Sequence, residues 1–285
     1  MSVPLPPVGL PAKAVALARE YADGSRVPAE PRDAATVVLV RPGASGPEVY
    51  LLVRQRSMAF AAGMAVFPGG GVDPRDAADE VPWAGPSVDQ WAEQLGCSTR
   101  EARALVCAAV RETFEESGVL LAGRSATEVV ADVSSDDWEA DRVALEARTL
   151  SLTELLERRG LVLRSDLLGA WSGWCTPVFE PRRYRTWFFV AALPAGQVTR
   201  DVSSESVSVR WQPALEAAAE AERGELALMP PTYLTCLDVG RFADADALLA
   251  EAARRRVAMH TPGVEGDRLT LPPGGAELLR ARGRL

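Results

Sequence analysis

The sequence predicts a mixed α/β sandwich, and three observations support this fold class. β-branched runs at 36–40 and 49–54 come first, a capped helix begins after Ser98, and strand patterns resume at 170–177 and 184–193. Because strands stand on both sides of one central helix, the pattern favours a mixed sheet with helices on its faces over a regular βαβ alternation.

The first hundred residues contain strands, a glycine loop and an insertion. A proline-rich extension over 1–33 carries a short amphipathic patch, AKAVALAREYA. TVVLV (36–40) and VYLLVR (49–54) are expected to form a hairpin, because RPGASGPE between them is rich in turn residues. AAGMAVFPGGGVD (61–73) reads as a strand end followed by three glycines, which allow close backbone approach to a ligand. The polar segment 74–97 is expected to be an inserted loop with a short helix.

The central helix has clear signals at both ends. Ser98 and Glu101 form a capping box, with Ser98 as the N-cap and Glu101 three residues later. The helix should run to Ser117, with Gly118 as its stop. Val110 and Phe114 fall on one side and the glutamates on the other, so we expect one face for the core and one for chemistry.

The remaining elements follow from periodicity. Residues 126–168 look helical and acidic, and VSVRW (207–211) is a strand pattern. Pro213 is expected at the N1 position of an alanine-rich helix. The pattern is helical again over 229–256, and the tail after it is expected to be loose.

These elements suggest a division of the chain into three parts. We expect an N-terminal extension at 1–33, a central domain at 34–222 and a C-terminal helical extension at 223–285 packed on the same domain. The central domain contains an insertion at 73–100 and the helical segment 126–168.

Composition excludes several classes of function. The net charge of -8 argues against a nucleic-acid partner and against an anionic membrane surface. No apolar run approaches the ~20 residues of a membrane span, and the first residues lack the pattern of a secretory signal. A single histidine, His260, near the C-terminus removes most Ser-His-Asp and Cys-His schemes, and the four cysteines show no zinc spacing. We expect a cytoplasmic protein with reduced thiols.

The run RETFEESGV (111–119) is the strongest chemical signal. Its glutamates lie within about one helical turn, and like charges at i,i+4 repel by roughly 0.2–0.5 kcal/mol per pair. A solvated acidic helix face is one explanation. The other is a hard divalent cation such as Mg²⁺, which prefers oxygen ligands and takes one or two carboxylates together with substrate phosphate oxygens. With the preceding FPGGG loop, the second explanation predicts hydrolysis of a phosphate anhydride.

The same run resembles the second half of the Nudix box, R-E-U-x-E-E-x-G-U with U apolar, apart from Thr113 at the first U, and FPGG supplies the glycine that opens the box. Gly70 lies 41 positions before Arg111, against about 14 in the usual box, so about 27 residues are inserted. Such an interrupted box is similar to the branch that includes the peroxisomal coenzyme A diphosphatases. QRSMAFAAGMAVFPGGGVD, LVCAAVRETFEESGVLL, FEPRRYRTWFFVAALP and MPPTYLTCL also resemble segments of this branch, between about residues 34 and 250.

The resemblance implies a Nudix-type α/β/α sandwich with a mixed sheet, plus inserted and C-terminal helices. It implies Mg²⁺ or Mn²⁺ as cofactor, with a metal site made of Gly70, Glu112, Glu115 and Glu116. It also implies a catalytic set of Arg111, Glu112, Glu115, Glu116 and Glu205. Arg111 would orient the glutamates and Glu205 would be the general base, although a plain surface glutamate is the alternative reading of VSSESVS. The acidic partner of Arg111 is open between Asp76 and Glu101.

Substrate binding is assigned to Arg56, Gly69, Gly70, Arg182 and Arg183. With Arg185, the two arginines after Pro181 form a basic cluster that could read a substrate phosphate, such as the 3′-phosphate of coenzyme A. The alternative is that this cluster answers the acidic segment 126–146.

The resemblance implies an enzyme that cleaves the diphosphate of a small-molecule nucleoside diphosphate derivative. Coenzyme A or an acyl-CoA is the first candidate, giving 3′,5′-ADP and phosphopantetheine or its acyl form. NADH, ADP-ribose or a nucleotide sugar is the second, and a non-catalytic nucleotide-binding regulator is the third. The apolar C-terminal helices would also suit a homodimer.

Overall fold

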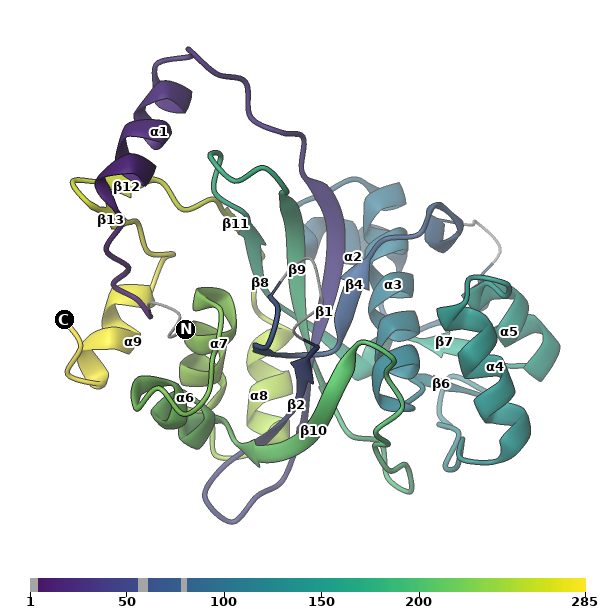
Figure 1. The fold of residues 1–285 in the computed structure, drawn as a ribbon. Coiled ribbons are helices and arrows are strands. Elements are labelled where there is room, and N and C mark those ends of the chain that lie inside the picture. Colours follow the sequence, from purple (N-terminus) through teal and green to yellow (C-terminus); the bar gives the residue numbers. More distant parts are fainter. Residues whose placement is uncertain (1–4, 56–60, 78–80) are drawn as a thin grey trace.

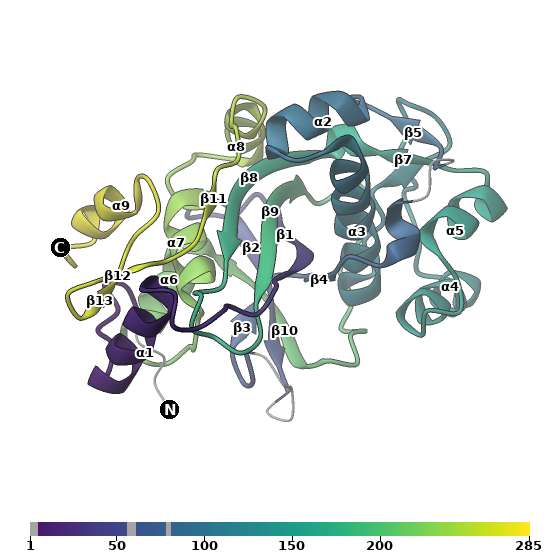
Figure 2. The same ribbon diagram turned by 90° about the horizontal axis from the view of Figure 1, so that it is seen from above.

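The computed structural model describes residues 5–55, 61–77 and 81–285. A mixed β-sheet lies between two layers of helices (Figure 1), and the view from above shows α3 on one face of the sheet and α6 and α7 on the other (Figure 2). The predicted α/β/α sandwich with a mixed sheet is therefore confirmed.

The main sheet has eight strands, and six of them follow the order β10-β2-β1-β9-β8-β11. The short β3 pairs with β2, and β4 pairs with β1. β1 pairs with β9 in parallel, and β8 with β11 in parallel, while the other pairs are antiparallel. The strands are β1 (Arg32–Arg41), β2 (Glu48–Arg54), β3 (Ala65–Val66), β4 (Gly69–Gly71), β8 (Leu168–Cys175), β9 (Tyr184–Ala192), β10 (Ser206–Pro213) and β11 (Met259–His260).

Alternation along the central strands creates two apolar cores. Val37 and Leu39 of β1 belong to the core beneath α3, whereas Val38 and Val40 belong to the opposite core. Successive side chains of a strand point to opposite faces, so a continuous apolar run such as TVVLV is the pattern of a strand buried on both sides.

The helices are distributed over both faces of the sheet. The first core is covered by α2 (Val88–Leu95) and α3 (Thr99–Ser117), with α4 (Asp136–Glu146) and α5 (Leu152–Arg159) outside α3. The second is covered by α6 (Ala214–Glu222), α7 (Pro230–Val239) and α8 (Ala245–Ala252). The apolar side chains of α7 and α8 that suggested a homodimer are thus buried within the chain itself.

The two ends of the chain lie together. Leu10 N–H donates to the Asp267 carbonyl at 2.7 Å, and Leu269 N–H donates to the Val8 carbonyl at 3.1 Å. The tail expected to be loose therefore contains regular structure. The end elements are α1 (Ala12–Ala22), the hairpin of β12 (Val264–Glu265) and β13 (Arg268–Leu269), and α9 (Gly275–Ala281).

The signals at the ends of α3 are confirmed. Ser98 and Glu101 exchange both bonds of a capping box, and Gly118 ends the helix in the left-handed region at φ 70°. The expectation for Pro213 is wrong by one position. Pro213 is the last residue of β10 and the N-cap of α6, because its ψ of 133° is still extended.

The two inserted segments are joined by a second, three-stranded sheet in the order β5-β7-β6. β5 (Trp83–Ala84) comes from the insertion in the box, whereas β6 (Ala122–Gly123) and β7 (Val162–Arg164) flank α4 and α5. The 3-10 helices η1 (Pro74–Ala77) and η2 (Ser165–Leu167) lie at the edges of these segments. Among the described residues, no helix is both long and apolar enough to cross a membrane.

Candidate active site

Arg111 lies on α3 and faces the acidic residue of η1. Its Nη2 donates to Asp76 Oδ2 at 2.9 Å, and its Nε donates to Asp76 Oδ1 at 3.0 Å. Nη2 also donates to the Gly71 carbonyl at 2.9 Å. Of the two candidates, Asp76 is therefore the acidic partner of Arg111. Glu101 instead bonds to Ser98 at the start of α3.

The third nitrogen of Arg111 holds two of the glutamates. Nη1 lies 2.7 Å from Glu112 Oε1 and 3.1 Å from Glu115 Oε1. Arg111 and the three box glutamates are each between 7% and 9% exposed. The acidic face of α3 is thus buried and is not a solvated surface.

The glycine strand β4 approaches this cluster from the sheet. Gly69 N–H donates to Glu116 Oε2 at 2.8 Å, and a Cβ atom on Gly70 would lie 2.6 Å from the Glu112 carboxylate. A Cβ on Gly69 would instead lie 2.5 Å from the Ala35 carbonyl of β1. The glycines therefore let one strand pass between β1 and two buried carboxylates, as a close backbone approach requires.

These contacts predict different outcomes for two alanine variants. Gly69→Ala should destabilise the protein by about 1–3 kcal/mol, because the new methyl group meets rigid backbone. Gly70→Ala should unfold at a urea concentration closer to that of the wild type, because the Glu112 carboxylate can turn away from the new methyl group. The same movement should lower the affinity for a divalent cation. Urea unfolding and calorimetric titration with Mn²⁺ would check both, and the reverse pattern would contradict this account.

Burial and mutual repulsion raise the pKa values of the three glutamates. Burial raises the pKa of Glu112 to about 7, with Arg111 opposing the rise and Glu115 adding to it. Burial also raises the pKa of Glu115, against the attraction of Arg111. The pKa of Glu116 is raised well above its ordinary value, by burial first and then by the charge of Glu112.

The residues fit a hard divalent cation in their chemistry. Three buried carboxyl groups, those of Asp76, Glu112 and Glu115, contact the single guanidinium of Arg111. The charge of Glu112 also raises the pKa of Glu116, and a bound cation would relieve this repulsion. Within the described part of the chain, no three His, Cys, Asp or Glu side chains are grouped so that they could hold a metal ion. Two carboxylates, Glu112 and Glu116, are nevertheless enough for Mg²⁺, which takes its other ligands from water and phosphate.

The raised pKa of Glu112 gives metal binding a defined pH dependence. Without metal, the folded state holds the Glu112 proton more tightly than the unfolded state, so stability falls by about 3 kcal/mol as pH rises from about 4.5 to about 7. A cation replaces that proton and restores the loss. The increase in Tm caused by Mn²⁺ should therefore be larger at pH 8 than at pH 6. Thermal scans with and without the ion would measure it, and an equal increase at both values would count against a metal at Glu112.

Glu205 lies beside this cluster, on the segment before β10. Its Oε2 accepts a hydrogen bond from Arg54 Nη2 at 2.6 Å, and its charge contributes to the raised pKa of Glu116. The Glu205 side chain is 46% exposed, so it can meet both solvent and the buried carboxylates. Its role as a base stays a prediction.

Arg54 is a residue that the sequence reasoning did not select. It ends β2, its side chain is 15% exposed, and its buried Nε has no hydrogen-bond partner among the described residues. An arginine at the end of the apolar run VYLLVR is the sequence signal that could have identified it, but the substrate-binding role was assigned to Arg56, two residues later. Arg56 itself lies outside the described residues.

The structure does not bring Arg182 and Arg183 to the glutamates. Arg182 is exposed, and Arg183 donates to the carbonyls of Thr176 and Ala29. Their neighbour Arg185 pairs with Asp33 at 2.7 Å and with Glu101 at 3.3 Å, so its partners lie on β1 and α3 and not in 126–146. Glu101 is about 22 Å from Glu116 along the helix axis, so the basic cluster lies at the other end of α3.

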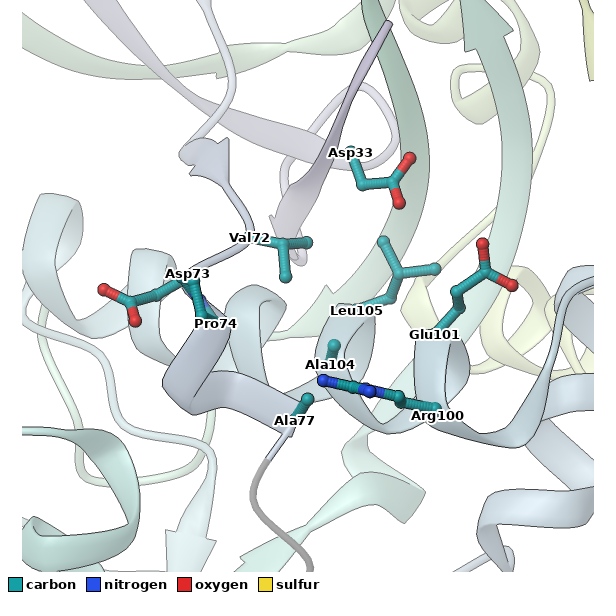
Figure 3. A pocket seen from close by; sticks show the side chains of 9 residues that line it. All are labelled: Asp33, Val72, Asp73, Pro74, Ala77, Arg100, Glu101, Ala104 and Leu105. Carbon is teal, nitrogen blue, oxygen red and sulfur yellow. The ribbon is translucent and has the colours of Figure 1, made fainter.

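A pocket of about 190 Å³ lies beside the first half of α3, between η1 and the start of β1. Figure 3 shows Val72 and Leu105 within it and the charged groups of Asp33, Glu101 and Arg100 around it. Its remaining lining residues are Asp73, Pro74, Ala77 and Ala104. The lining contains neither Arg111 nor a box glutamate, so we do not assign the substrate to this pocket.

The sequence of this chain matches a protein-family model and several known proteins. The family model described as "NUDT19 Nudix domain" matches residues 86–241 of the chain. The chain is 28% identical over 220 residues to "Putative nudix hydrolase 7" of Caenorhabditis elegans. This match covers 75% of this chain and 62% of the relative. The chain is 24% identical over 234 residues to "Acyl-coenzyme A diphosphatase NUDT19" of Xenopus laevis, covering 70% and 62%. The chain thus spans less than two thirds of the length of these two relatives.

A solved structure supports the fold. The chain is similar to a NUDIX hydrolase from Alicyclobacillus acidocaldarius, with a TM-score of 0.64 and 26% sequence identity. The match covers 78% of this chain and 96% of that one. The core of the α/β/α sandwich is therefore shared with a protein of similar architecture.

Proposed function

We propose that this chain, which belongs to the NUDT19 Nudix domain family, is a metal-dependent hydrolase of nucleoside diphosphate derivatives, with coenzyme A or an acyl-CoA as its substrate. The observation that carries the proposal is the bridge from Arg111 to Asp76, Glu112 and Glu115. It brings the two parts of the interrupted box together across the insertion. The choice of coenzyme A is supported by the similarity to acyl-coenzyme A diphosphatases.

The buried glutamates would hold the cation. Glu112 and Glu116 would bind Mg²⁺ or Mn²⁺, and when bound this ion supplies charge neutralisation for the diphosphate. Arg111 keeps Glu112 and Glu115 oriented through Nη1, and Gly69 N–H fixes Glu116. Catalysis by such a site depends on positioning and on electrostatic stabilisation more than on covalent chemistry by the protein.

Glu205 would take the proton of the attacking water. The water oxygen forms a bond to one phosphorus, the bond from that phosphorus to the bridging oxygen breaks, and Glu205 accepts the proton. For coenzyme A the products are 3′,5′-ADP and phosphopantetheine. Arg54 donates to Glu205 at 2.6 Å and its side chain is 15% exposed, and it would contact a diphosphate oxygen.

A direct assay tests the proposal. The purified protein would be incubated with Mg²⁺ or Mn²⁺ and with coenzyme A, NADH, ADP-ribose or UDP-glucose, and the products separated by chromatography. Release of 3′,5′-ADP from coenzyme A well above the other rates is expected. A preference for another diphosphate would replace the substrate and keep the site. Tight binding of one compound with no turnover of any would indicate a nucleotide-binding regulator instead.

Three further expectations stay predictions. They are a homodimer, a cytoplasmic location and the substrate-binding roles of Arg182 and Arg183. The roles of these two arginines would require a substrate that extends to the other end of α3.

A further inference from the structure

The inserted helix α4 contacts the end of the glutamate helix through one buried arginine. Arg142 Nη1 donates to the Glu115 carbonyl at 2.7 Å, and only 3% of Arg142 is exposed. This carbonyl lies in the last turn of α3, where carbonyls have no partner within the helix, and a guanidinium there also suits the negative end of the helix dipole. Arg142 therefore fixes the part of α3 that carries the box glutamates.

Two glutamates on either side of Arg142 extend this contact to another segment. Arg142 Nη1 lies 3.0 Å from Glu146 Oε2, and Nη2 lies 2.8 Å from Glu139 Oε1. Both glutamates share one face of α4 with Arg142, because residues three and four positions apart are neighbours on a helix. Their remaining oxygens point to the loop before β10.

This loop is the one that carries Glu205. Glu146 Oε1 accepts hydrogen bonds from the backbone N–H and the hydroxyl of Ser204, at 3.2 and 2.5 Å. Glu139 Oε2 accepts from Arg200 Nη1 at 2.7 Å. The loop is thus held by α4 at two points, one of them next to Glu205 in the chain.

The other side of Glu205 is held by the sheet. Gln55 N–H donates to the Glu205 carbonyl at 2.9 Å, and Arg54 holds the carboxylate. Gln55 Nε2 also donates to the Ser204 carbonyl at 2.7 Å, whereas the N–H and the hydroxyl of Ser204 are held by Glu146.

We propose that Arg142 and Glu146 of α4 are positioning residues that fix the Glu205 loop against the end of the glutamate helix. The inference rests on the proposed function, in which Glu205 takes the proton from water. It gives the inserted segment 126–168 a specific task, which is to hold the base at a set place relative to Glu112 and Glu116. Misplacement of a reacting group by about 1 Å can cost on the order of 100-fold in rate.

The test uses Glu146→Ala and Ser204→Ala in the full chain. Glu146→Ala should lower kcat by about tenfold or more with KM within about twofold, because geometry is lost and substrate contacts are not. Ser204→Ala, which keeps the N–H, should have a smaller effect, and the double variant should be no slower than Glu146→Ala alone. Hydrogen exchange of the metal-free, substrate-free protein should be faster over residues 201–206 in Glu146→Ala.

Asp137→Ala is the matched control, because Asp137 is an exposed carboxylate on the same helix that pairs with Arg159. It should leave kcat and the exchange of 201–206 unchanged. The inference is overturned if Glu146→Ala keeps the wild-type kcat, or if exchange over 201–206 does not change. Failure of the wild type to hydrolyse any diphosphate would instead overturn the proposed function, and the exchange measurement distinguishes the two because it needs no turnover.

Discussion

Glu116→Gln is expected to lower kcat by more than about tenfold without lowering the stability of the folded protein. The variant removes a carboxylate that we place on the cation, and metal-assisted hydrolysis depends on that ligand. It does not remove the local hydrogen bond, because a glutamine oxygen can still accept from Gly69 N–H, as Glu116 Oε2 does at 2.8 Å. It also removes the repulsion from Glu112 that raises the pKa of Glu116, so the metal-free variant should be at least as stable as the wild type.

Glu101→Ala is a suitable comparison, since Glu101 lies on the same helix but completes the cap at Ser98. Loss of this cap should cost about 1 kcal/mol of stability and leave kcat unchanged. Steady-state kinetics should therefore show a loss of kcat only for Glu116→Gln, and urea unfolding should show a loss of stability only for Glu101→Ala. A Glu116→Gln protein with wild-type turnover would remove Glu116 from the metal site, and a marked loss of stability would show that its charge is satisfied within the fold.

Arg111→Ala is expected to destabilise the protein by about 3–5 kcal/mol at pH 7.5, since removing one partner of a buried ion pair leaves the other charges uncompensated. In this case Asp76, Glu112 and Glu115 all lose their cation. The loss should be smaller at pH 5, because Glu112 and Glu115, whose pKa values are already raised by burial, can take up protons there.

Urea unfolding at the two pH values, with Mn²⁺ absent, would measure this difference. Asp76→Asn in the Arg111→Ala background provides the control, because it removes one of the stranded charges and should recover part of the loss. A destabilisation below about 1 kcal/mol at pH 7.5 would show that the cluster does not depend on Arg111 as a counter-charge.

Much of the fold could be predicted from local signals. The capping box at Ser98, the stop at Gly118 and the apolar runs of β1 and β2 each depend on neighbouring residues, and the structure confirms them. The burial of the whole acidic face of α3 could not be predicted in this way. It results from η1, β4 and α4 lying against α3, and this arrangement is fixed by contacts between distant segments.

The candidate site divides in the same manner. The three glutamates and Arg111 are read from one continuous run, whereas Asp76 was one of two candidates until η1 could be placed in space. Arg54 and Glu146 carry no motif of their own and become relevant only through contacts 151 and 58 positions away in the chain. Arg182 and Arg183 illustrate the opposite case, in which a basic sequence cluster lies far from the acidic one.

The parallel pairing of β1 with β9 affects how the protein can fold while it is being synthesised on the ribosome. Asp33 and Arg185, which face each other across this pair, are separated by 152 positions. At about 5–20 residues per second, β1 is therefore synthesised on the order of ten seconds or more before its central neighbour exists. During that interval the edge and the apolar faces of the β1–β2 hairpin are uncovered, so the nascent chain exposes aggregation-prone surface for longer than a protein built from local contacts does.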